Sequence, residues 1–572
     1  MIYCRRNLYV IIKERDFKKV DLDNNDSFSL CKRTTIDKKL LTKFPDPIQT
    51  YLNSEKQVLL SRKIFKKILE IVTKSLSKKN KKLIEELLKP YLELKISIYL
   101  YLKNCIPNYK FYKLYNSRRW ETFDNKNQLI ISIEKEYMKE KGGIFDLCGK
   151  FSFKQFNFVH KLLACIQVYL LKKIINKKDI FLLSCKKSYF MPKIFENLKN
   201  RNKNIIVYSQ SKNLLKISFI IFKQIYSLIS KKTINNEFFM IPTKNSKNNN
   251  INFNLDKYNY SFIDKEYFIK LLEDVESYIK LSKGYKLYNK KLFKNYLRNN
   301  SNAIFHTNRF SELNALSNIL SDLGCKQHLI SHGTHTLQKD SLIDDMVSES
   351  LSIGMIKSNI PKITIYSQSK FSDDYLSNKK LDFKKIQPLN QIKKTKDRTN
   401  NSNILNILSA GTVKQLGARR YYFESSFEYI YGMIDLCKKL RKLDFAVRLT
   451  IRIREVKHEI NMDLIRTIKD QFYDIVEISK NISIADDIKN SDCLLALSST
   501  TLEEAINYKT TSMSYGLSKY NHFKFYKGNR YRIHPDLKNY SKLKKLEEIL
   551  GRNFTYLEDE FLFREKSLFD YI

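Results

Sequence analysis

Residues 482–516 read ISIADDIKNSDCLLALSSTTLEEAINYKTTSMSYG, and this stretch decides the expected fold. Its apolar run at 493–497 (CLLAL) has the length of a buried parallel strand. A helix start follows at Leu502, after four hydroxyl residues: Ser498, Ser499, Thr500 and Thr501. Free backbone N–H groups and the positive end of a helix dipole make such a junction a candidate anion site. The alternative is an ordinary N-cap with acidic residues in the first turn.

The same alternation of short apolar runs and helical segments occurs upstream and downstream of this stretch. It predicts strands at 179–184, 204–210, 238–242, 303–307, 327–331, 363–367, 404–409, 445–451, 474–478 and 511–514. It predicts helices at 192–201, 214–231, 263–281, 311–323, 422–443 and 464–472. Strands that alternate with helices at this spacing indicate doubly wound parallel sheets. The expected fold class is therefore α/β, with two Rossmann-like domains that face a central cleft.

The domain organisation follows from these patterns and from the length of 572 residues, which is too long for one core. Helical periodicity at 59–75, 81–102 and 158–174 predicts a mainly helical N-terminal region over residues 1–175. A first Rossmann-like domain is expected at 176–390 and a second at 403–545. The polar segment 391–402 (QIKKTKDRTNNS) is the expected linker between the two domains, and residues 546–572 are the expected C-terminal helix.

The charge balance is strongly basic, with 104 Lys and Arg against 60 Asp and Glu and a net charge of +44. Part of this excess is compositional, because Lys, Asn and Ile are abundant throughout the chain. A field of this sign attracts anions such as nucleic acid, phosphorylated sugars or an acidic membrane surface. Nine cysteines without a C-x-x-C pair indicate a reducing cytoplasm.

Membrane insertion is not expected. The best candidate, residues 217–229, contains Lys223 and is shorter than the roughly 20 residues that a spanning helix needs. The N-terminal apolar run is too short and too soon charged for a signal peptide. The sequence therefore predicts a soluble protein that is cytoplasmic and peripheral at the inner face of the cell membrane.

The candidate site residues follow predicted strands. In open α/β sheets, ligands bind outside the carboxyl ends of the strands. After the strand at 327–331 come His332, Gly333, Thr334 and His335. In the second domain the corresponding residues are Gly411, Thr412, Arg452, Arg454 and the hydroxyl run Ser498–Thr501. We expect both sets to line the cleft.

Two motifs make the C-terminal half resemble the donor domain of two-Rossmann (GT-B) glycosyltransferases. Residues 329–334 (LISHGT) are similar to the family's strand followed by His-Gly. Residues 491–505 are similar to its aspartate, hydroxyl pair and Glu-Ala, here Asp492, Ser498-Ser499 and Glu504-Ala505. The resemblance covers roughly residues 300–520 and is to the bacterial surface-polysaccharide group: capsule synthesis, Kdo- and sialyl-type transferases, and CDP-glycerol glycerophosphotransferases. One departure is Arg452-Ile453-Arg454-Glu455, where many members have a basic strand end with His-Pro.

The resemblance implies roles for these residues. The second domain would bind a nucleotide-sugar donor, and Arg452, Arg454 and the helix opening at Ser498–Thr501 would stabilise the departing nucleotide without a metal. Glu504 matches the position that holds the ribose hydroxyls; a solvent-facing carboxylate in a first helical turn is its alternative. His332 is the candidate general base, since His titrates near neutral pH, and a structural histidine is the alternative. Gly333, Thr334 and His335 would line the acceptor side.

Other features have ordinary explanations. The spacing of His328, His332 and His335 would matter for a metal only on a helix, and the strand-like run before Gly333 argues against one. The acidic pairs at 344–345, 373–374 and 486–487 are explained as solvated helix caps. The cluster at 118–120 (RRW) either grips a phosphate or base or forms a surface patch over a core aromatic.

The predicted function is transfer of a sugar, or a glycerophosphate-like group, from a nucleotide donor to a surface polysaccharide or lipid-linked glycan. The nucleotide sugar is a co-substrate, and neither a metal nor another cofactor is expected. The alternatives are a UDP-sugar 2-epimerase-like enzyme and a basic nucleic-acid-binding protein. Against nucleic acid, the basic residues are spread along the whole chain, with no recognition helix or stacking motif.

Overall fold

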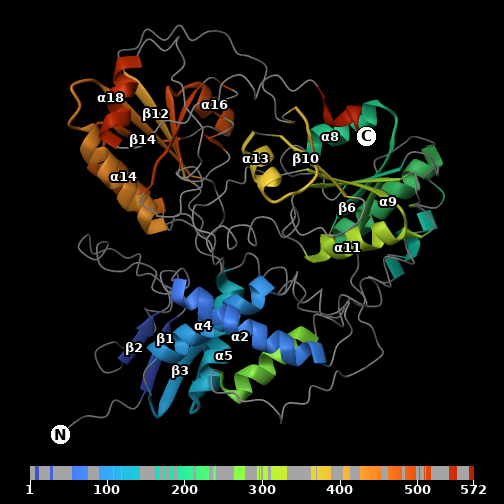
Figure 1. Ribbon diagram of the computed structural model, residues 1–572, viewed down its shortest axis with the longest axis horizontal. Helices are drawn as coiled ribbons and strands as arrows, with labels where there is room; N and C mark the ends of the chain where they lie inside the picture. Colours follow the sequence, from blue (N-terminus) through green and yellow to red (C-terminus); the bar gives the residue numbers. More distant parts are fainter. Residues whose placement is uncertain are drawn as a thin grey trace.

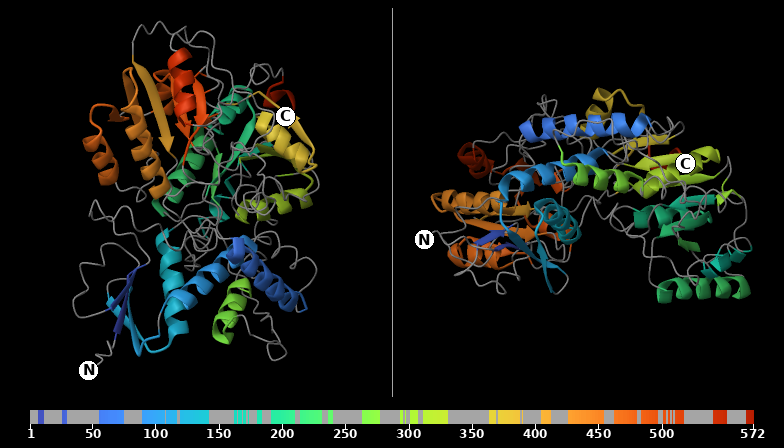
Figure 2. Two further views of the ribbon diagram at one scale, coloured as in Figure 1. Left: turned by 60° about the vertical axis from the view of Figure 1, so that its left-hand side comes forward. Right: turned by 90° about the horizontal axis from the view of Figure 1, so that it is seen from below.

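Three sheets organise the described part of the chain, and Figures 1 and 2 show the two larger ones above an N-terminal unit. The computed structural model describes the following residues, some ranges only in part: 7–11, 26–29, 55–74, 89–141, 162–173, 180–183, 191–209, 214–230, 236–239, 263–276, 293–306, 311–330, 363–389, 404–411, 426–453, 462–479, 483–496, 501–516, 540–550 and 566–572.

The first Rossmann-like domain contains a seven-stranded sheet in the order β11-β10-β9-β8-β5-β6-β7, with every neighbouring pair parallel. The chain runs from β5 outward through β6 and β7, and β8 then lies on the other side of β5, so the sheet is doubly wound. The strands are β5 Ile180–Leu183, β6 Asn204–Ser209, β7 Asn236–Phe239, β8 Asn302–His306, β9 Lys326–Ile330, β10 Ile363–Ser367 and β11 Phe383–Lys385; the helices are α8 Met191–Asn200, α9 Leu214–Ser230, α11 Ser311–Asp322 and α13 Lys370–Asn378.

The second Rossmann-like domain contains a five-stranded parallel sheet in the order β14-β13-β12-β15-β16. The chain again starts in the middle, at β12, runs to one edge and returns to the other side. The strands are β12 Leu405–Gly411, β13 Val447–Ile453, β14 Val476–Ile478, β15 Cys493–Ala496 and β16 Thr511–Ser514; the helices are α14 Ser426–Leu440, α15 Met462–Gln471, α16 Ile484–Lys489 and α18 Tyr540–Leu550.

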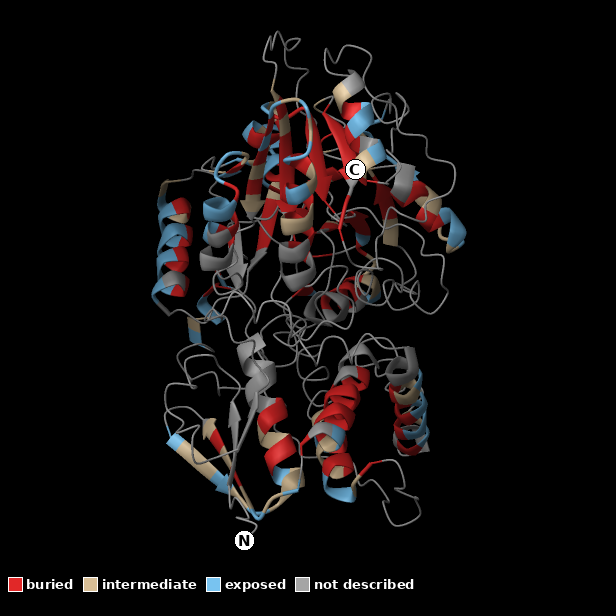
Figure 3. Cartoon of the chain, turned by 90° about the vertical axis from the view of Figure 1, so that its left-hand side faces the viewer, coloured by how far each residue is buried: buried red, intermediate tan, exposed pale blue. Residues whose placement is uncertain are grey.

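Alternate residues of the central strands pack on opposite faces of this sheet. Leu405 and Ile407 of β12 belong to one core with α14, α15 and α18, whereas Leu408 and Ala410 belong to a second core with Ile488 of α16. Apolar residues on both faces make β15 a continuous buried run, as expected for a parallel strand covered by helices on both sides. Figure 3 shows these strands as the most buried part of the domain.

These strand orders confirm the expectation of two Rossmann-like domains. Strands β10 and β16 begin and end at the expected residues, and most other elements agree within a few positions. Short apolar runs bounded by polar residues carry this information locally. The domain boundaries stay predictions.

The N-terminal unit differs from the mainly helical region expected. Besides α2 Glu55–Lys74, α4 Lys89–Cys105 and α5 Lys126–Lys141, it contains a four-stranded sheet in the order β2-β1-β3-β4. The pairs β1–β2 and β1–β3 are parallel and β3–β4 is antiparallel; the strands are β1 Asn7–Ile11, β2 Asp26–Ser29, β3 Phe111–Asn116 and β4 Arg119–Phe123. In β3, Tyr112 and Leu114 are buried and their neighbours are half-buried, which is a period of two that helical templates miss.

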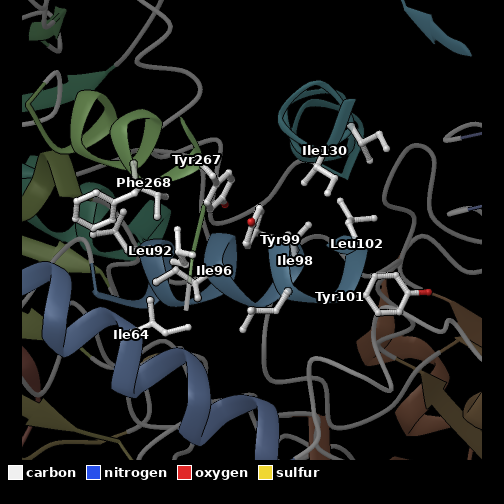
Figure 4. Packing of buried hydrophobic residues seen from close by; sticks show 14 of the residues in the cluster. Ile64, Leu92, Ile96, Ile98, Tyr99, Tyr101, Leu102, Ile130, Tyr267 and Phe268 are labelled. Atoms are coloured by element: carbon white, nitrogen blue, oxygen red, sulfur yellow. The ribbon is translucent and has the colours of Figure 1, made fainter. Parts of the chain in front are cut away.

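A segment from the middle of the first Rossmann-like domain completes this unit. Helical residues 265–276 lie between β7 and β8 in sequence, but Tyr267, Phe268 and Leu271 pack with α2, α4 and α5 in one core. Figure 4 shows Phe268 beside Leu92 of α4 and Tyr267 beside Tyr99 of the same helix, with the two tyrosine rings stacked at a centroid distance of 4.0 Å. The chain therefore leaves the first Rossmann-like domain and returns to it, and the N-terminal unit is built from two separate stretches of sequence.

The C-terminal tail returns to the first Rossmann-like domain. Gln387 N–H donates to Lys566 O at 2.9 Å, and Leu568 is fully buried in a core with residues of β5 and β6. Residues 568–570 form one 3-10 turn (Leu568–Asp570), which begins with Ser567 N–H donating to Asp570 Oδ2 at 2.6 Å. Lys566 and Ser567 before it are not helical, so the helix expected for 546–572 does not run through to the C-terminus. Residues 551–565 lie outside the described part.

Cysteines of the described part act as small apolar residues. Cys325, Cys437 and Cys493 are buried free thiols, and Cys165 is an exposed one. Burial raises the pKa of the Cys325 and Cys437 thiols to about 12, which keeps both protonated at neutral pH. No helix of the described residues has both the length and the apolar content needed to cross a membrane.

Candidate functional site

The strand order places a switch point in the second Rossmann-like domain between β12 and β15. From β12 the chain goes first to β13 on one side, and later to β15 on the other. At such a point the connections diverge, and a crevice opens outside the carboxyl ends of the two strands. Gly411 ends β12 and Ala496 ends β15, so the predicted residues Thr412 and Ser498–Thr501 follow directly in sequence from this place.

Gly411 and Arg452 lie at the same edge of the sheet. In the parallel register of β12 and β13, Ala410 is opposite Arg452 and Gly411 is opposite Ile453. Two of the predicted donor-binding residues are therefore brought together, although they are separated by about forty positions in sequence. The backbone at Gly411 carries no Cβ, which allows a ligand to approach it closely.

Arg452 is held by a buried carboxylate. Its guanidinium Nη1 forms an ion pair with Asp487 Oδ2 on α16 and lies 3.3 Å from both Ser479 Oγ and Ser483 O. Ser479 Oγ donates to the same Asp487 oxygen at 2.6 Å. The Asp487 side chain is 3% exposed and that of Arg452 is 18% exposed, so the pair is largely out of water. Such a pair fixes the orientation of Arg452 and carries no net charge.

The position of Asp487 corrects the interpretation of its acidic pair as a solvated helix cap. Asp486 is exposed as expected, but Asp487 is buried. The helix cap is Ser483, whose Oγ accepts from Ala485 N–H at 3.1 Å. Asp373 of α13 is a second case: it is buried, with Lys385 Nζ 3.6 Å from its Oδ2, while Asp374 is half-buried. In each pair one carboxylate is buried and contacts a cation from a neighbouring strand. Asp487 contacts Arg452 of β13, and Asp373 contacts Lys385 of β11.

Asp492 has a structural role at the opposite edge of the sheet. Its Oδ2 accepts from Asn406 N–H at 2.8 Å, and its own N–H donates to Asn406 O at 2.8 Å. Asn406 is near the start of β12 and Asp492 immediately precedes β15, so both lie at the amino ends of their strands. This part of the motif at 491–505 therefore aligns the two central strands and does not face the switch-point crevice.

The junction after β15 is described only in part. Thr501, Leu502 and Ala505 are helical, and Leu502 and Ala505 are buried in the core shared with α16. Thr501 is half-buried. Ser498, Ser499, Thr500 and Glu504 lie outside the described residues, as do Thr412 and Arg454, so their predicted roles stay predictions.

In the first Rossmann-like domain, the described residues include β9, the strand that precedes the candidate base His332. β9 ends at Ile330, and His332, Gly333, Thr334 and His335 lie outside the described residues. His328 is in β9 and is buried. Its position in a strand agrees with the rejection of a helical metal face. The role of His332 stays a prediction.

His328 is a neutral structural histidine. Its Nε2 is 3.0 Å from Asn302 Oδ1, which only accepts, so Nε2 carries the proton. Nδ1 then accepts from the Tyr366 hydroxyl at 2.9 Å. Burial, with smaller contributions from Lys326 and Lys384, lowers the pKa of His328 to about 4. This ring connects β8, β9 and β10 and does not titrate near neutral pH.

The cluster at 118–120 is at the surface of the N-terminal unit. The side chain of Arg119 is 81% exposed, with Nη2 3.6 Å from Glu121 Oε1. Trp120 is half-buried, and its ring packs edge-on against Tyr115 at a centroid distance of 5.3 Å. For these two residues the contacts favour the surface patch; Arg118 lies outside the described residues. Among the residues that the structure describes, no group of His, Cys, Asp and Glu could hold a metal ion.

Sequence reasoning missed Asp487 and Ser479. The contact between Arg452 and Asp487 spans 35 positions and depends on how α16 packs beside β13 and β14. No motif marks it. The one available signal was the strand end itself: an arginine that lies largely out of water at the end of a strand needs a partner.

No protein-family model matches the sequence, and no curated protein does either. Solved structures with similarity include a protein described as a UDP-N-acetylglucosamine 2-epimerase from Listeria monocytogenes, at 8% identity and a TM-score of 0.34 over 59% of this chain and 79% of that one. The lipopolysaccharide outer core galactosyltransferase WaaB has 10% identity and a TM-score of 0.31, over 59% and 79%. The calicheamicin glycosyltransferase has 8% identity and a TM-score of 0.32, over 59% and 80%. Because these scores are low, the fold assignment rests on the strand orders above.

Proposed function

We propose that the chain is a nucleotide-sugar-dependent glycosyltransferase with its donor site at the carboxyl edge of the second Rossmann-like domain. The observation that carries the proposal is that Gly411 and Arg452 lie one register position apart on neighbouring strands at that edge, beside the switch point between β12 and β15. Phosphate-bearing ligands bind at this place in doubly wound sheets. Of the two motifs that resemble GT-B glycosyltransferases, the second continues in sequence from the carboxyl end of β15 with Ser498 and Ser499.

The chemistry of the donor site follows from its residue types. A departing nucleotide leaves with negative charge on its phosphates, and oriented N–H groups and guanidinium groups stabilise such charge. Asp487 neutralises Arg452, so Arg452 acts mainly by holding a fixed hydrogen-bond donor at the crevice. In this proposal Arg454 and the helix opening at Ser498–Thr501 supply most of the positive potential, and no metal is required.

The acceptor side is assigned to the first Rossmann-like domain. His332 follows β9 and takes the proton from the acceptor hydroxyl as general base. Gly333, Thr334 and His335 belong to the same connection, and the cleft between the two domains brings it to the donor. The acceptor is a surface polysaccharide or lipid-linked glycan on the cytoplasmic side.

A turnover assay on the full chain tests this proposal. The protein is incubated with CMP-, UDP-, GDP- and CDP-linked sugars and a glycan acceptor, and nucleotide release is measured. We expect release with one donor class, and we expect His332→Ala to lower kcat by roughly 10²- to 10⁴-fold, the usual contribution of a general base. His160→Ala is the control, since His160 lies outside both Rossmann-like domains in sequence.

The outcomes separate the alternatives. Release that depends on the acceptor supports transfer, whereas an epimerised or free sugar without any acceptor would favour the epimerase-like alternative. Normal turnover in a folded His332→Ala variant would remove His332 from the mechanism. Binding of duplex DNA or RNA that persists at physiological salt, with no nucleotide-sugar turnover, would replace the proposal by nucleic-acid binding.

A further inference from the structure

Helix α9 of the first Rossmann-like domain has apolar residues on two opposite faces. One face, with Ile217, Ile220 and Ile221, is buried against Leu170 in a small core. A helix that is apolar all round is normally buried all round. The outer face of α9 is not: Figure 2 (right) shows this helix at the lower right edge of the molecule.

The outer face carries five large apolar side chains at helical spacing. Their positions, 215, 219, 222, 226 and 229, fall in one narrow stripe along α9, because a helix turns 100° per residue. Their exposed fractions are Leu215 81%, Phe219 58%, Phe222 66%, Tyr226 55% and Ile229 78%. Soluble proteins rarely expose contiguous apolar surface of this kind, and where they do it marks an interaction site.

A helical segment packed against α9 also carries exposed apolar residues. Leu163 and Leu170 pack on the inner face of α9 in the same small core. The exposed large apolar residues of this segment are Leu162, Ile166 and Tyr169, at i, i+4 and i+7, with exposed fractions of 50%, 37% and 61%. Two packed helical segments therefore both present apolar stripes to solvent. We call the five α9 residues and these three the apolar face.

The charge around the apolar face is exclusively positive in sequence. Between Glu196 and Glu237 the chain has no acidic residue, and it carries lysines at 199, 203, 212, 216, 223, 231 and 232 together with Arg201. Between Asp146 and Asp179 there is again no acidic residue, with lysines at 150, 154, 161, 172, 173, 177 and 178. Lys223 is exposed at the border of the stripe, with its Nζ 4.6 Å from the centre of the Phe219 ring.

We propose that the apolar face docks on an anionic lipid membrane surface. Leu, Ile, Phe and Tyr side chains enter the boundary between headgroups and acyl chains, while the flanking lysines pair with lipid phosphates. A helix that lies in the plane of the interface needs an apolar stripe with basic residues beside it, and α9 has the outer stripe with Lys223 at its border. The inner face keeps the helix attached to the domain.

The charges favour lipid over a second copy of this chain. A two-fold contact through α9 would bring the lysines of both copies together, with no carboxylate in either stretch to compensate them. The net charge of +44 adds repulsion between copies and attraction to an anionic surface. The inference does not depend on the proposed catalytic activity.

Vesicle co-sedimentation of the full chain tests the inference. The vesicles contain phosphatidylcholine alone or phosphatidylcholine with phosphatidylglycerol. We expect binding to the mixed vesicles, weaker binding to phosphatidylcholine alone, and partial release at high salt. The double variant Phe222→Ser with Ile229→Ser should weaken binding to mixed vesicles roughly tenfold or more, because both side chains lose their apolar contact.

Tyr473→Ser is the matched control, since Tyr473 is an aromatic residue of the second Rossmann-like domain with an exposed fraction of 81%. It should leave vesicle binding unchanged, and all three proteins should keep the same melting temperature. The inference is overturned if the unchanged chain does not bind mixed vesicles, or if the double variant binds them equally well. A dimer that the double variant converts to monomer, without vesicle binding, would assign the apolar face to a second copy.

Discussion

Arg452 on β13 and Asp487 on α16 form a largely buried ion pair at the carboxyl edge of the second sheet, and Ser479 binds the same carboxylate oxygen. Removing one partner of such a pair leaves the other charge desolvated and alone. We expect Asp487→Ala to lower the free energy of unfolding by about 3 kcal/mol. Urea denaturation followed by circular dichroism measures this change.

The exposed pair of Lys545 and Asp444 provides the control. Lys545 Nζ is 2.7 Å from Asp444 Oδ1, but the side chain of Lys545 is 46% exposed and that of Asp444 is 74% exposed, so water screens their attraction. We expect Asp444→Ala to lower the free energy of unfolding far less than Asp487→Ala does. Equal costs for Asp444→Ala and Asp487→Ala would show that the Arg452 pair is not buried in solution.

Lys95 is the cation at the centre of the N-terminal unit. Its Nζ is 2.8 Å from Glu134 Oε1 and also binds Asp274, which belongs to the segment inserted from the first Rossmann-like domain. Burial raises the pKa of Glu134, and the attraction of Lys95 opposes that rise. We expect Lys95→Met to lower the free energy of unfolding by about 3 to 5 kcal/mol.

Lys103 on the same helix is the matched control. It binds Asp264 of the same inserted segment at 2.9 Å, but its side chain is 41% exposed. Lys103→Met should cost about 1 kcal/mol or less. If thermal unfolding shows the two variants to be equally stable, the inserted segment is not held to the N-terminal unit in the way described.

His328 gives the first Rossmann-like domain a specific sensitivity to acid. Its pKa is about 4 in the folded protein and about 6.5 when the chain is unfolded. Between these values the unfolded chain binds the additional proton, so stability falls as the pH is lowered from 6.5 to 4. The loss attributable to this ring is about 3 kcal/mol over that interval. His328→Gln should remove it.

Comparison of the two pH profiles isolates this effect, because the carboxylates titrate equally in both proteins. The difference in unfolding free energy between wild type and His328→Gln should shrink as the pH falls toward 4. Parallel profiles for the two proteins would contradict the buried, neutral state of His328.

Local sequence patterns predict the central strands of the two parallel sheets well where a strand is a short apolar run. β5 (IFLL) and β15 (CLLA) illustrate this, and both are buried at every position. The sheet of the N-terminal unit was missed because β3 (FYKLYN) and β4 (RWETF) mix charged and aromatic residues. Their burial depends on α4, α5 and the inserted helix, which no local window contains.

The candidate site was predictable to the extent that strand ends are predictable. Gly411 and Arg452 are neighbours because two parallel strands start in register, and both strands were expected. The partner of Arg452 was not predictable, since Asp487 reaches it across 35 positions of sequence. Asp492 shows the converse: a motif residue whose hydrogen bonds to Asn406 place it at the other edge of the sheet.

Calorimetric titration of nucleotide sugars tests the donor site most directly. The full chain and the double variant Ser499→Ala with Arg454→Gln are titrated with the CMP-, UDP-, GDP- and CDP-linked donors. We predict that one donor class binds the unchanged chain and that the variant, with its melting temperature preserved, binds it roughly tenfold or more weakly, as expected when charge-assisted hydrogen bonds to phosphate are lost. Binding of no donor, or equal binding by both proteins, would contradict a nucleotide-sugar site at the carboxyl edge of the second sheet.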